Sequence, residues 1–184
     1  TSLGQLVVGG GTASNDFPVT AGAWDTTYSG GVTDGFVSII SPDGTTLEYC
    51  TFAGTNNYDQ VYFVETDADD NIYITGQTKG VWPVTAGVYT EPNGKHFITK
   101  LEPDLSAIMY SMVFGNGGSA INISPSAFLV DQCENVYVSG WGGIVNQGYN
   151  ISTGFTVDMT ITPDAIQSTT DGSDFYFFVI SKNA

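Results

Sequence analysis

The stretch Gln60–Gly76, QVYFVETDADDNIYITG, decides the fold of this chain. Its two apolar segments, QVYFVE and NIYITG, are joined by the acidic turn Asp67-Ala68-Asp69-Asp70, and this pattern predicts a β-hairpin. The pattern returns 64 residues later in Ser126–Gly140, SAFLVDQCENVYVSG, and Leu6–Gly9 resembles the second strand of another copy. A repeat of this period indicates a series of similar β units.

Other shared segments divide the chain into three copies, at approximately residues 1–55, 56–118 and 119–184. The loop sequence FPVTAGAW at residues 17–24 returns as WPVTAGVY at 82–89, whereas the third copy has MTITPDAIQ. Phe97 aligns with Phe175 at a longer offset of 78 residues, which places an insertion around Gly142–Thr156. The third copy is therefore expected to depart most from the common pattern.

The strand pattern predicts an all-β fold. Ten strands are expected, near residues 6–9, 36–40, 47–52, 60–65, 71–75, 96–101, 108–114, 126–131, 135–139 and 174–181. Four-stranded antiparallel units in series are typical of β-propeller blades. Residues 1–184 are therefore predicted to form one β-propeller region of about three blades, with the first and the last incomplete. Alternation of apolar positions predicts the residues buried between blades: Val61, Phe63, Ile72, Ile74, Phe97, Val136, Val138 and Val179.

Composition excludes several classes of partner. The chain has 184 residues, 41% of them hydrophobic, and a net charge of −15 with only four Lys and Arg residues, all of them Lys. Such a surface repels the phosphates of nucleic acids and of anionic membranes. No apolar run reaches the length that a membrane helix requires, so no membrane insertion is expected. The opening TSLGQLVVGG has no initiator Met and no signal sequence, which is typical of a mature or excised chain.

Several ordered motifs resemble those of one known family. LEPDLSAIMYSMVFG, VETDADDNIYITG, DFPVTAGAW and TDGFVSIISPDG are similar to the bacterial seven-bladed β-propeller repeats of SBBP type. Such repeats occur in large surface proteins, including ones that resemble type IX secretion substrates of gliding bacteria. The resemblance covers nearly the whole chain and implies an exported, adhesin-like or scaffold module of a longer polypeptide. It supplies no catalytic residues, metal ligands or cofactor.

The acidic turn Asp67–Asn71 offers a candidate calcium loop, because its D-x-D-x-N spacing matches the first ligands of an EF-hand. The later glycine and the closing glutamate are absent, since Ile72 and Thr78 occupy those positions. The equivalent turn in the third copy has Cys133 in place of the middle carboxylate. Asp and Asn are also ordinary residues of tight turns. Both readings, a calcium loop and a plain hairpin turn, remain open at this stage.

Histidine and cysteine give no catalytic constellation. His96 is the only histidine, and the positions that match it in the other copies, Gly35 and Asp174, share no chemistry with it. We therefore expect His96 to be structural. Cys50 lies within a predicted strand and Cys133 in a predicted hairpin turn. Because these positions differ and belong to non-adjacent copies, separate free thiols are expected in place of a disulfide.

Two classes of function are compatible with these observations. The first is a non-catalytic module, extracellular or at the cell surface, that acts as a scaffold, adhesin or protein-interaction domain. The alternative is a propeller that binds or cleaves carbohydrate, with aromatic side chains and carboxylates on one face. Strand edges at both ends of the array need partners. Further blades of the same polypeptide or neighbouring protein chains are expected to provide them, and surface glycans are the partner in the alternative.

Overall fold

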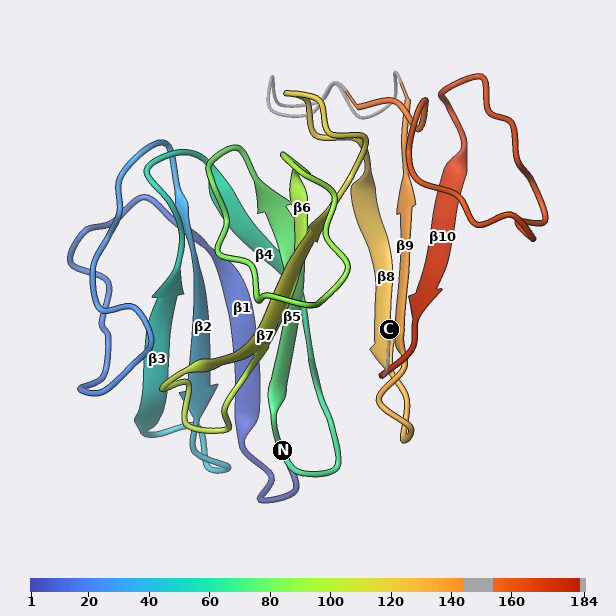
Figure 1. The fold of residues 1–184 in the computed structure, drawn as a ribbon. Helices are drawn as coiled ribbons and strands as arrows, with labels where there is room; N and C mark the ends of the chain where they lie inside the picture. Colours follow the sequence, from blue (N-terminus) through green and yellow to red (C-terminus); the bar gives the residue numbers. More distant parts are fainter. Residues whose placement is uncertain (144–153, 183–184) are drawn as a thin grey trace.

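The computed structural model describes residues 1–143 and 154–182, and these contain strands without helices. Figure 1 shows three antiparallel sheets side by side. Sheet 1 has β1 (Leu6–Thr12), β2 (Asp34–Ile40) and β3 (Leu47–Ala53); sheet 2 has β4 (Asp59–Thr66), β5 (Ile72–Thr78), β6 (His96–Leu101) and β7 (Ile108–Phe114); sheet 3 has β8 (Ser124–Val130), β9 (Val136–Trp141) and β10 (Phe175–Ile180). The all-β prediction and its ten strands are confirmed, with three, four and three strands per sheet.

The hairpin turns repeat between sheets in their geometry as well as in their sequence. In the β4–β5 turn, Asp67 N–H donates to the carbonyl of Asn71 (3.2 Å), and Asp70 has a φ of 62°. In the β8–β9 turn, Asp131 N–H donates to Asn135 (3.0 Å), and Glu134 has a φ of 61°. Asp is among the residues that tolerate a left-handed backbone, as Asp70 does here. The side chains of Asp67 and Asp131 cap the two turns by accepting from the N–H groups of Asn71 and Asn135. The acidic turns therefore fix the register of two equivalent hairpins.

Each of these hairpins also carries a β-bulge. The pairing of β4 with β5 shifts between Val61 and Phe63, and the pairing of β8 with β9 shifts between Pro125 and Ala127. An extra residue reverses the alternation of faces along the rest of the strand. Val61 consequently packs toward sheet 1, whereas Phe63 packs toward sheet 3.

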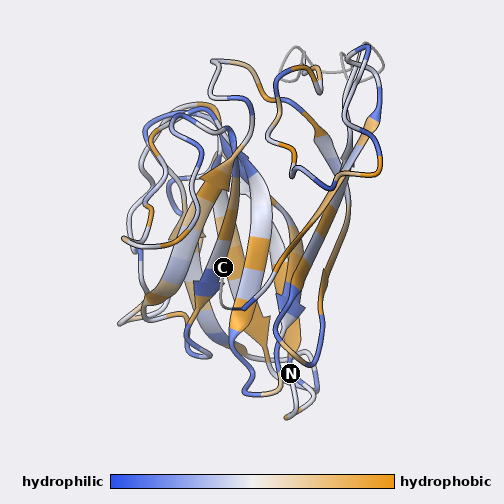
Figure 2. Ribbon diagram, turned by 45° about the vertical axis from the view of Figure 1, so that its right-hand side comes forward, coloured by the Kyte–Doolittle hydropathy of each residue, from blue (hydrophilic) through white to orange (hydrophobic). Residues whose placement is uncertain are grey.

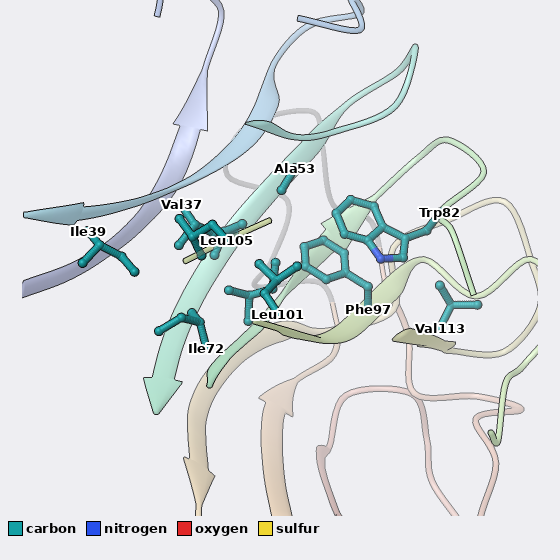
Figure 3. Packing of buried hydrophobic residues seen from close by; sticks show 11 residues of the cluster. Val37, Ile39, Ala53, Ile72, Trp82, Phe97, Leu101, Leu105 and Val113 are labelled. Carbon is teal, nitrogen blue, oxygen red and sulfur yellow. The ribbon is translucent and has the colours of Figure 1, made fainter. Parts of the chain in front are cut away.

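The core consists of two apolar layers, one on each side of sheet 2. We call the two sides face A and face B, and we use the same names for the equivalent sides of sheets 1 and 3. Face A of sheet 2 is turned toward sheet 1 and includes Ile72, Ile74 and Phe97, which are 0% exposed. Face B is turned toward sheet 3 and includes Tyr73 and Ile98. Figure 3 shows the layer on face A, where the rings of Trp82 and Phe97 lie parallel with centroids 3.7 Å apart.

Hydropathy follows this layering. Figure 2 shows hydrophobic residues concentrated along the strands, where the sheets stack. Within this arrangement β1 packs beside β4, and β4 packs beside β8. The described residues contain no helix long and apolar enough to cross a membrane.

Six of the eight predicted core residues are buried, namely Val61, Ile72, Ile74, Phe97, Val136 and Val138. The prediction for Val179 is wrong, because its side chain is 46% exposed on the outer side of sheet 3. Phe63 is only half-buried, since the bulge turns it toward the rim of the second layer. Alternation groups residues by face only where no bulge interrupts the strand, and it cannot show which face another sheet covers.

The alignment of Phe97 with Phe175 is wrong by one residue. His96 pairs with Gln77 on β5, and Phe175 pairs with Trp141 at the equivalent position of β9. Phe175 is therefore the counterpart of His96 in sheet 3, and the prediction that Asp174 matches His96 is wrong. In a strand, a shift of one residue moves every side chain to the other face. Of the insertion expected around Gly142–Thr156, residues 144–153 lie outside the described residues.

Candidate functional site

A charged cluster joins sheets 2 and 3. Lys100 on β6 lies 2.8 Å from a carboxylate oxygen of Asp67 and 2.9 Å from one of Glu134. Lys182 also pairs with Glu134. The Lys100 ammonium lies 4.9 Å from the centre of the Tyr73 ring. The two acidic hairpin turns thus place their carboxylates around one buried lysine, which links neighbouring sheets.

These ion pairs shift the pKa values of Asp67, Glu134 and Lys100. The side chains of Asp67 and Lys100 are 2% and 8% exposed. Burial alone would raise the pKa of Asp67, but hydrogen bonds from Lys100 and Asn71 outweigh it and hold that pKa below its usual range. Hydrogen bonds from Lys182 and Lys100 lower the pKa of Glu134. Burial alone would lower the pKa of Lys100, but the hydrogen bonds to its carboxylate partners outweigh burial and raise that pKa above its usual value.

The same contacts bear on the candidate calcium loop Asp67–Asn71. One Asp67 oxygen accepts from the N–H groups of Asp69 and Asn71, both at 3.0 Å, and the other contacts Lys100. Asp70 turns away and accepts from Ser2. The first carboxylate of the motif, Asp67, thus caps the turn and pairs with the ammonium group of Lys100. No group of three or more His, Cys, Asp or Glu placed to hold a metal occurs in residues 1–143 and 154–182.

A cavity of about 280 Å³ opens beside the charged cluster, between sheets 2 and 3. Its walls come from β7, from the loop before β6 and from the end of β10. The lining includes Tyr73, Val88, Tyr89, Lys100, Met109, Tyr110, Met112, Glu134, Val136, Ile180, Ser181 and Lys182. Glu134 is the carboxylate of this lining, and its pKa is lowered, so it stays ionised. A general acid needs a raised pKa, which Glu134 does not have.

His96 is buried, with 0% exposure, and its ring stacks on Phe114 at 5.1 Å between centroids. Its Nε2 accepts from the backbone N–H groups of Asn122 (3.1 Å) and Ile123 (3.2 Å). Burial lowers the pKa of His96 to about 3, so the ring is neutral. His96 therefore ties β6 to the segment that leads into sheet 3, which is a structural role.

Two buried carboxyl groups lie between sheets 1 and 2. Asp34 and Asp59 are both 0% exposed, and each has one oxygen, Oδ1, without a hydrogen-bond partner among the described residues. The other oxygen of Asp34 accepts from Ser29 N–H (2.5 Å), and that of Asp59 accepts from Thr55 (2.6 Å). Burial raises the pKa of Asp34 to about 6, and the charge of Asp59 adds to the shift. Burial also raises the pKa of Asp59.

Asp34→Asn is expected to stabilise the protein at pH 7.5 by about 1–2 kcal/mol and to have little effect near pH 4. The folded-state pKa lies above the ordinary value of 3.8, so the ionised carboxylate opposes folding at neutral pH. That opposition disappears as the pH falls through 6 toward 3.8. Urea unfolding at both pH values measures the difference.

Asp43→Asn is the control for this prediction. Asp43 is exposed, and hydrogen bonds from Ser41 and Thr45 lower the pKa of its carboxyl group. Its replacement is not expected to stabilise the protein at pH 7.5. Equal effects of Asp34→Asn at the two pH values would show that the change acts by packing and not through ionisation.

Both cysteines occupy the kinds of position that the sequence suggested, a strand and a hairpin turn. Cys50 is buried in β3, Cys133 is exposed in the β8–β9 turn, and both are free thiols. Cys50 Sγ lies 3.0 Å from Ser38 Oγ. Trp24 and Trp82 pack edge to face between sheets 1 and 2, with centroids 6.3 Å apart. Cys50, Trp24 and Trp82 thus contribute to packing.

The outer faces of the stack remain apolar and exposed. On face A of sheet 1, Leu6 is 54% exposed, yet its counterpart in sheet 2 is Ile72, at 0%. On face B of sheet 3, Phe177 is 62% exposed, whereas its counterpart Ile98 is at 0%. Further exposed members of these two faces are Val8, Leu47, Leu129, Phe175 and Val179. Positions that a neighbouring sheet buries in sheet 2 are thus exposed to solvent on the outer faces of sheets 1 and 3.

Sequence reasoning missed the charged cluster and the cavity. The available signal was Lys100, the single charged residue in the run HFITKL of β6. A buried lysine requires a partner, but Asp67 and Glu134 come from separate hairpins, which only the stacking brings together. No protein-family model matches the chain, and no curated protein matches it.

Proposed function

We propose that the three sheets are consecutive blades of a β-propeller and that the chain is a non-catalytic interaction module, acting as a scaffold or adhesin outside the cell. The main support for this proposal is the pair of exposed apolar faces, face A of sheet 1 and face B of sheet 3. Their counterparts in sheet 2 are buried against a neighbouring sheet. Large exposed apolar patches favour protein–protein contact. The partners are further blades of the same polypeptide or neighbouring chains.

The arrangement of polar groups supports a non-catalytic role. The carboxylates beside the cavity are ion-paired with Lys100 and Lys182, and their pKa values are lowered. Asp34 and Asp59, two carboxyl groups whose pKa is raised, have no exposed surface on which to meet a substrate. The resemblance of the repeats to those of exported bacterial surface proteins supports an extracellular or cell-surface location.

The 184-residue chain is expected to self-associate, and the association should strengthen with salt. Burying the open faces is favourable, but the net charge of −15 opposes it until salt screens the repulsion. Multi-angle light scattering over a range of protein and salt concentrations measures the effect. The double change Phe177→Asp and Val179→Asp should restore the monomer with an unchanged β-type circular dichroism spectrum.

A matched control introduces the same two charges elsewhere. Val81 and Ile166 are exposed, at 92% and 107%, but lie outside the strands. Their replacement by Asp should leave the association as it is in the unmodified chain. A monodisperse monomer of the unmodified chain at every concentration and salt level would contradict the proposal, because its outer faces would then need no partner.

A carbohydrate-binding or carbohydrate-cleaving propeller is the second candidate. It is favoured by the aromatic and charged lining of the cavity, where Tyr89, Tyr110 and Glu134 lie together. Aromatic side chains beside polar groups are common in binding sites. Glycan-array binding that is lost on Tyr89→Ala, or turnover of a polysaccharide, would favour this candidate over the interaction module.

A further inference from the structure

In sheets 1 and 2 a loop threonine covers the outer edge of the last strand. Thr20 N–H donates to Cys50 O (3.0 Å), and Cys50 N–H donates to Thr20 Oγ1 (2.9 Å). Thr85 and Ser111 repeat this pair of bonds, at 2.8 and 2.9 Å. Cys50 lies in β3 and Ser111 in β7. The loop thus satisfies backbone groups that an edge strand would otherwise expose.

The third copy has the same loop without the strand that it covers elsewhere. Ala165 N–H donates to Thr162 O (3.1 Å), as Ala23 N–H donates to Thr20 O (3.3 Å), so Thr162 is the counterpart of Thr20. Thr162 is exposed, and its backbone N–H donates to no acceptor among the described residues. Figure 1 shows this loop standing out beside β10, whose outer side borders no described strand.

The cavity has a filled counterpart between sheets 1 and 2. There Leu105, in the turn between β6 and β7, is 0% exposed, and its carbonyl accepts from Trp24 N–H (2.8 Å). Tyr89 occupies the loop position equivalent to Trp24, and it lines the cavity with Val88. Its N–H has no acceptor within the described part of the chain. The cavity therefore lies where a leucine-bearing turn would enter.

We propose that the outer edge of β10 is an acceptor site for a β-strand of this same repeat type, a strand like β7. It would run antiparallel to β10 and place a small residue such as Ser or Cys opposite Phe178. That residue would exchange two hydrogen bonds with Thr162. The side chain of a leucine in the turn before the strand would fill the cavity, and the carbonyl of that leucine would accept a hydrogen bond from Tyr89 N–H. The inference rests on the proposed function and names the partner at one edge.

The donor strand belongs to none of the sheets already formed. β7 pairs with β6 on one side and is bonded to the Thr85 loop on the other. β3 is held in the same way by β2 and the Thr20 loop. Releasing either strand would open a buried layer. Main-chain pairing at an exposed sheet edge, combined with one side-chain pocket, is a general mode of peptide capture.

A synthetic peptide with the sequence of residues 105–114, LSAIMYSMVF, is the probe. It should bind the 184-residue chain in calorimetric titration, and the backbone amides of β10 should gain protection from hydrogen exchange. A scrambled peptide of the same composition should do neither. Replacing the leucine of the peptide by serine should weaken binding at least about tenfold, because the cavity is then left unfilled.

Thr162→Pro tests the loop contact, since it removes the backbone N–H and the Oγ1 that would bond to the incoming strand, while leaving a solvent-exposed loop to accommodate the ring. The expected result is binding weakened by about tenfold. Thr169→Pro, in the same loop, is the control and should leave binding unchanged. Binding without protection of β10, or binding insensitive to Thr162→Pro and to the serine peptide, would overturn the acceptor site.

The test separates this inference from the proposed function. Self-association depends on the outer faces, so Phe177→Asp with Val179→Asp abolishes it. Peptide capture depends on the edge of β10, the Thr162 loop and the cavity. Loss of peptide binding in a chain that still self-associates overturns the acceptor site alone. A strictly monomeric chain that captures the peptide contradicts association through the faces and supports the acceptor site.

Discussion

Phe97→Ala should lower the free energy of unfolding by about 3–5 kcal/mol, the largest single loss expected for a core change in this protein. The Phe97 ring is 0% exposed and lies face to face with Trp82, with an angle of 6° between the planes. It sits at the centre of the layer between sheets 1 and 2 (Figure 3). Truncation leaves a cavity that rigid strands on both sides cannot close. Chemical denaturation of the monomeric chain measures the loss.

Phe177→Ala is the matched control, because Phe177 has the same side chain in a strand but is 62% exposed. Its loss should be within about 1 kcal/mol under conditions where the chain is monomeric. A loss below about 1 kcal/mol for Phe97→Ala itself would mean that the layer between sheets 1 and 2 is not packed as described.

Lys100→Met should cost about 3 kcal/mol at pH 7, even though methionine fits an apolar layer. Lys100 is 7% exposed and neutralises Asp67, whose side chain is 2% exposed. Without the ammonium, a buried carboxylate has no cation to balance it. Because burial alone raises the pKa of Asp67, the variant should recover part of the loss at low pH, where that carboxyl group is protonated.

The double variant Asp67→Asn with Lys100→Met separates charge from packing. Removing both charges should be less destabilising than Lys100→Met alone, so the two effects should not add. Lys79→Met is the control, because Lys79 makes no ion pair with any described residue. Additive effects of the two changes would contradict a specific Lys100–Asp67 pair.

The sequence predicted the strands well because local signals determine them. The turn residues of Asp67–Asn71 and Pro42–Gly44 interrupt alternating apolar runs, and such signals act within a few residues. The burial of Phe63 and Val179 was harder to predict. A bulge after Val61 reverses the faces of β4, and only the arrangement of whole sheets shows that nothing covers Val179.

The charged cluster was not predicted for a related reason. Lys100, Asp67 and Glu134 are distant in the sequence, and each is unremarkable in its own strand or turn. The cavity likewise arises between elements of two sheets, at Tyr89 and Ile180. Periodicity describes one strand at a time, so features made by the stacking of sheets escape it.

The two faces of each sheet are different, and this gives the stack a direction. Inside the molecule, face A of one sheet always meets face B of the next. A two-fold axis would instead bring identical faces together, so a symmetric dimer cannot reproduce these contacts. Copies that associate through the open faces add head to tail, and each addition leaves one face of either kind still exposed. Such growth ends only when the rotation per step closes a ring, and otherwise it produces open polymers of unlimited length.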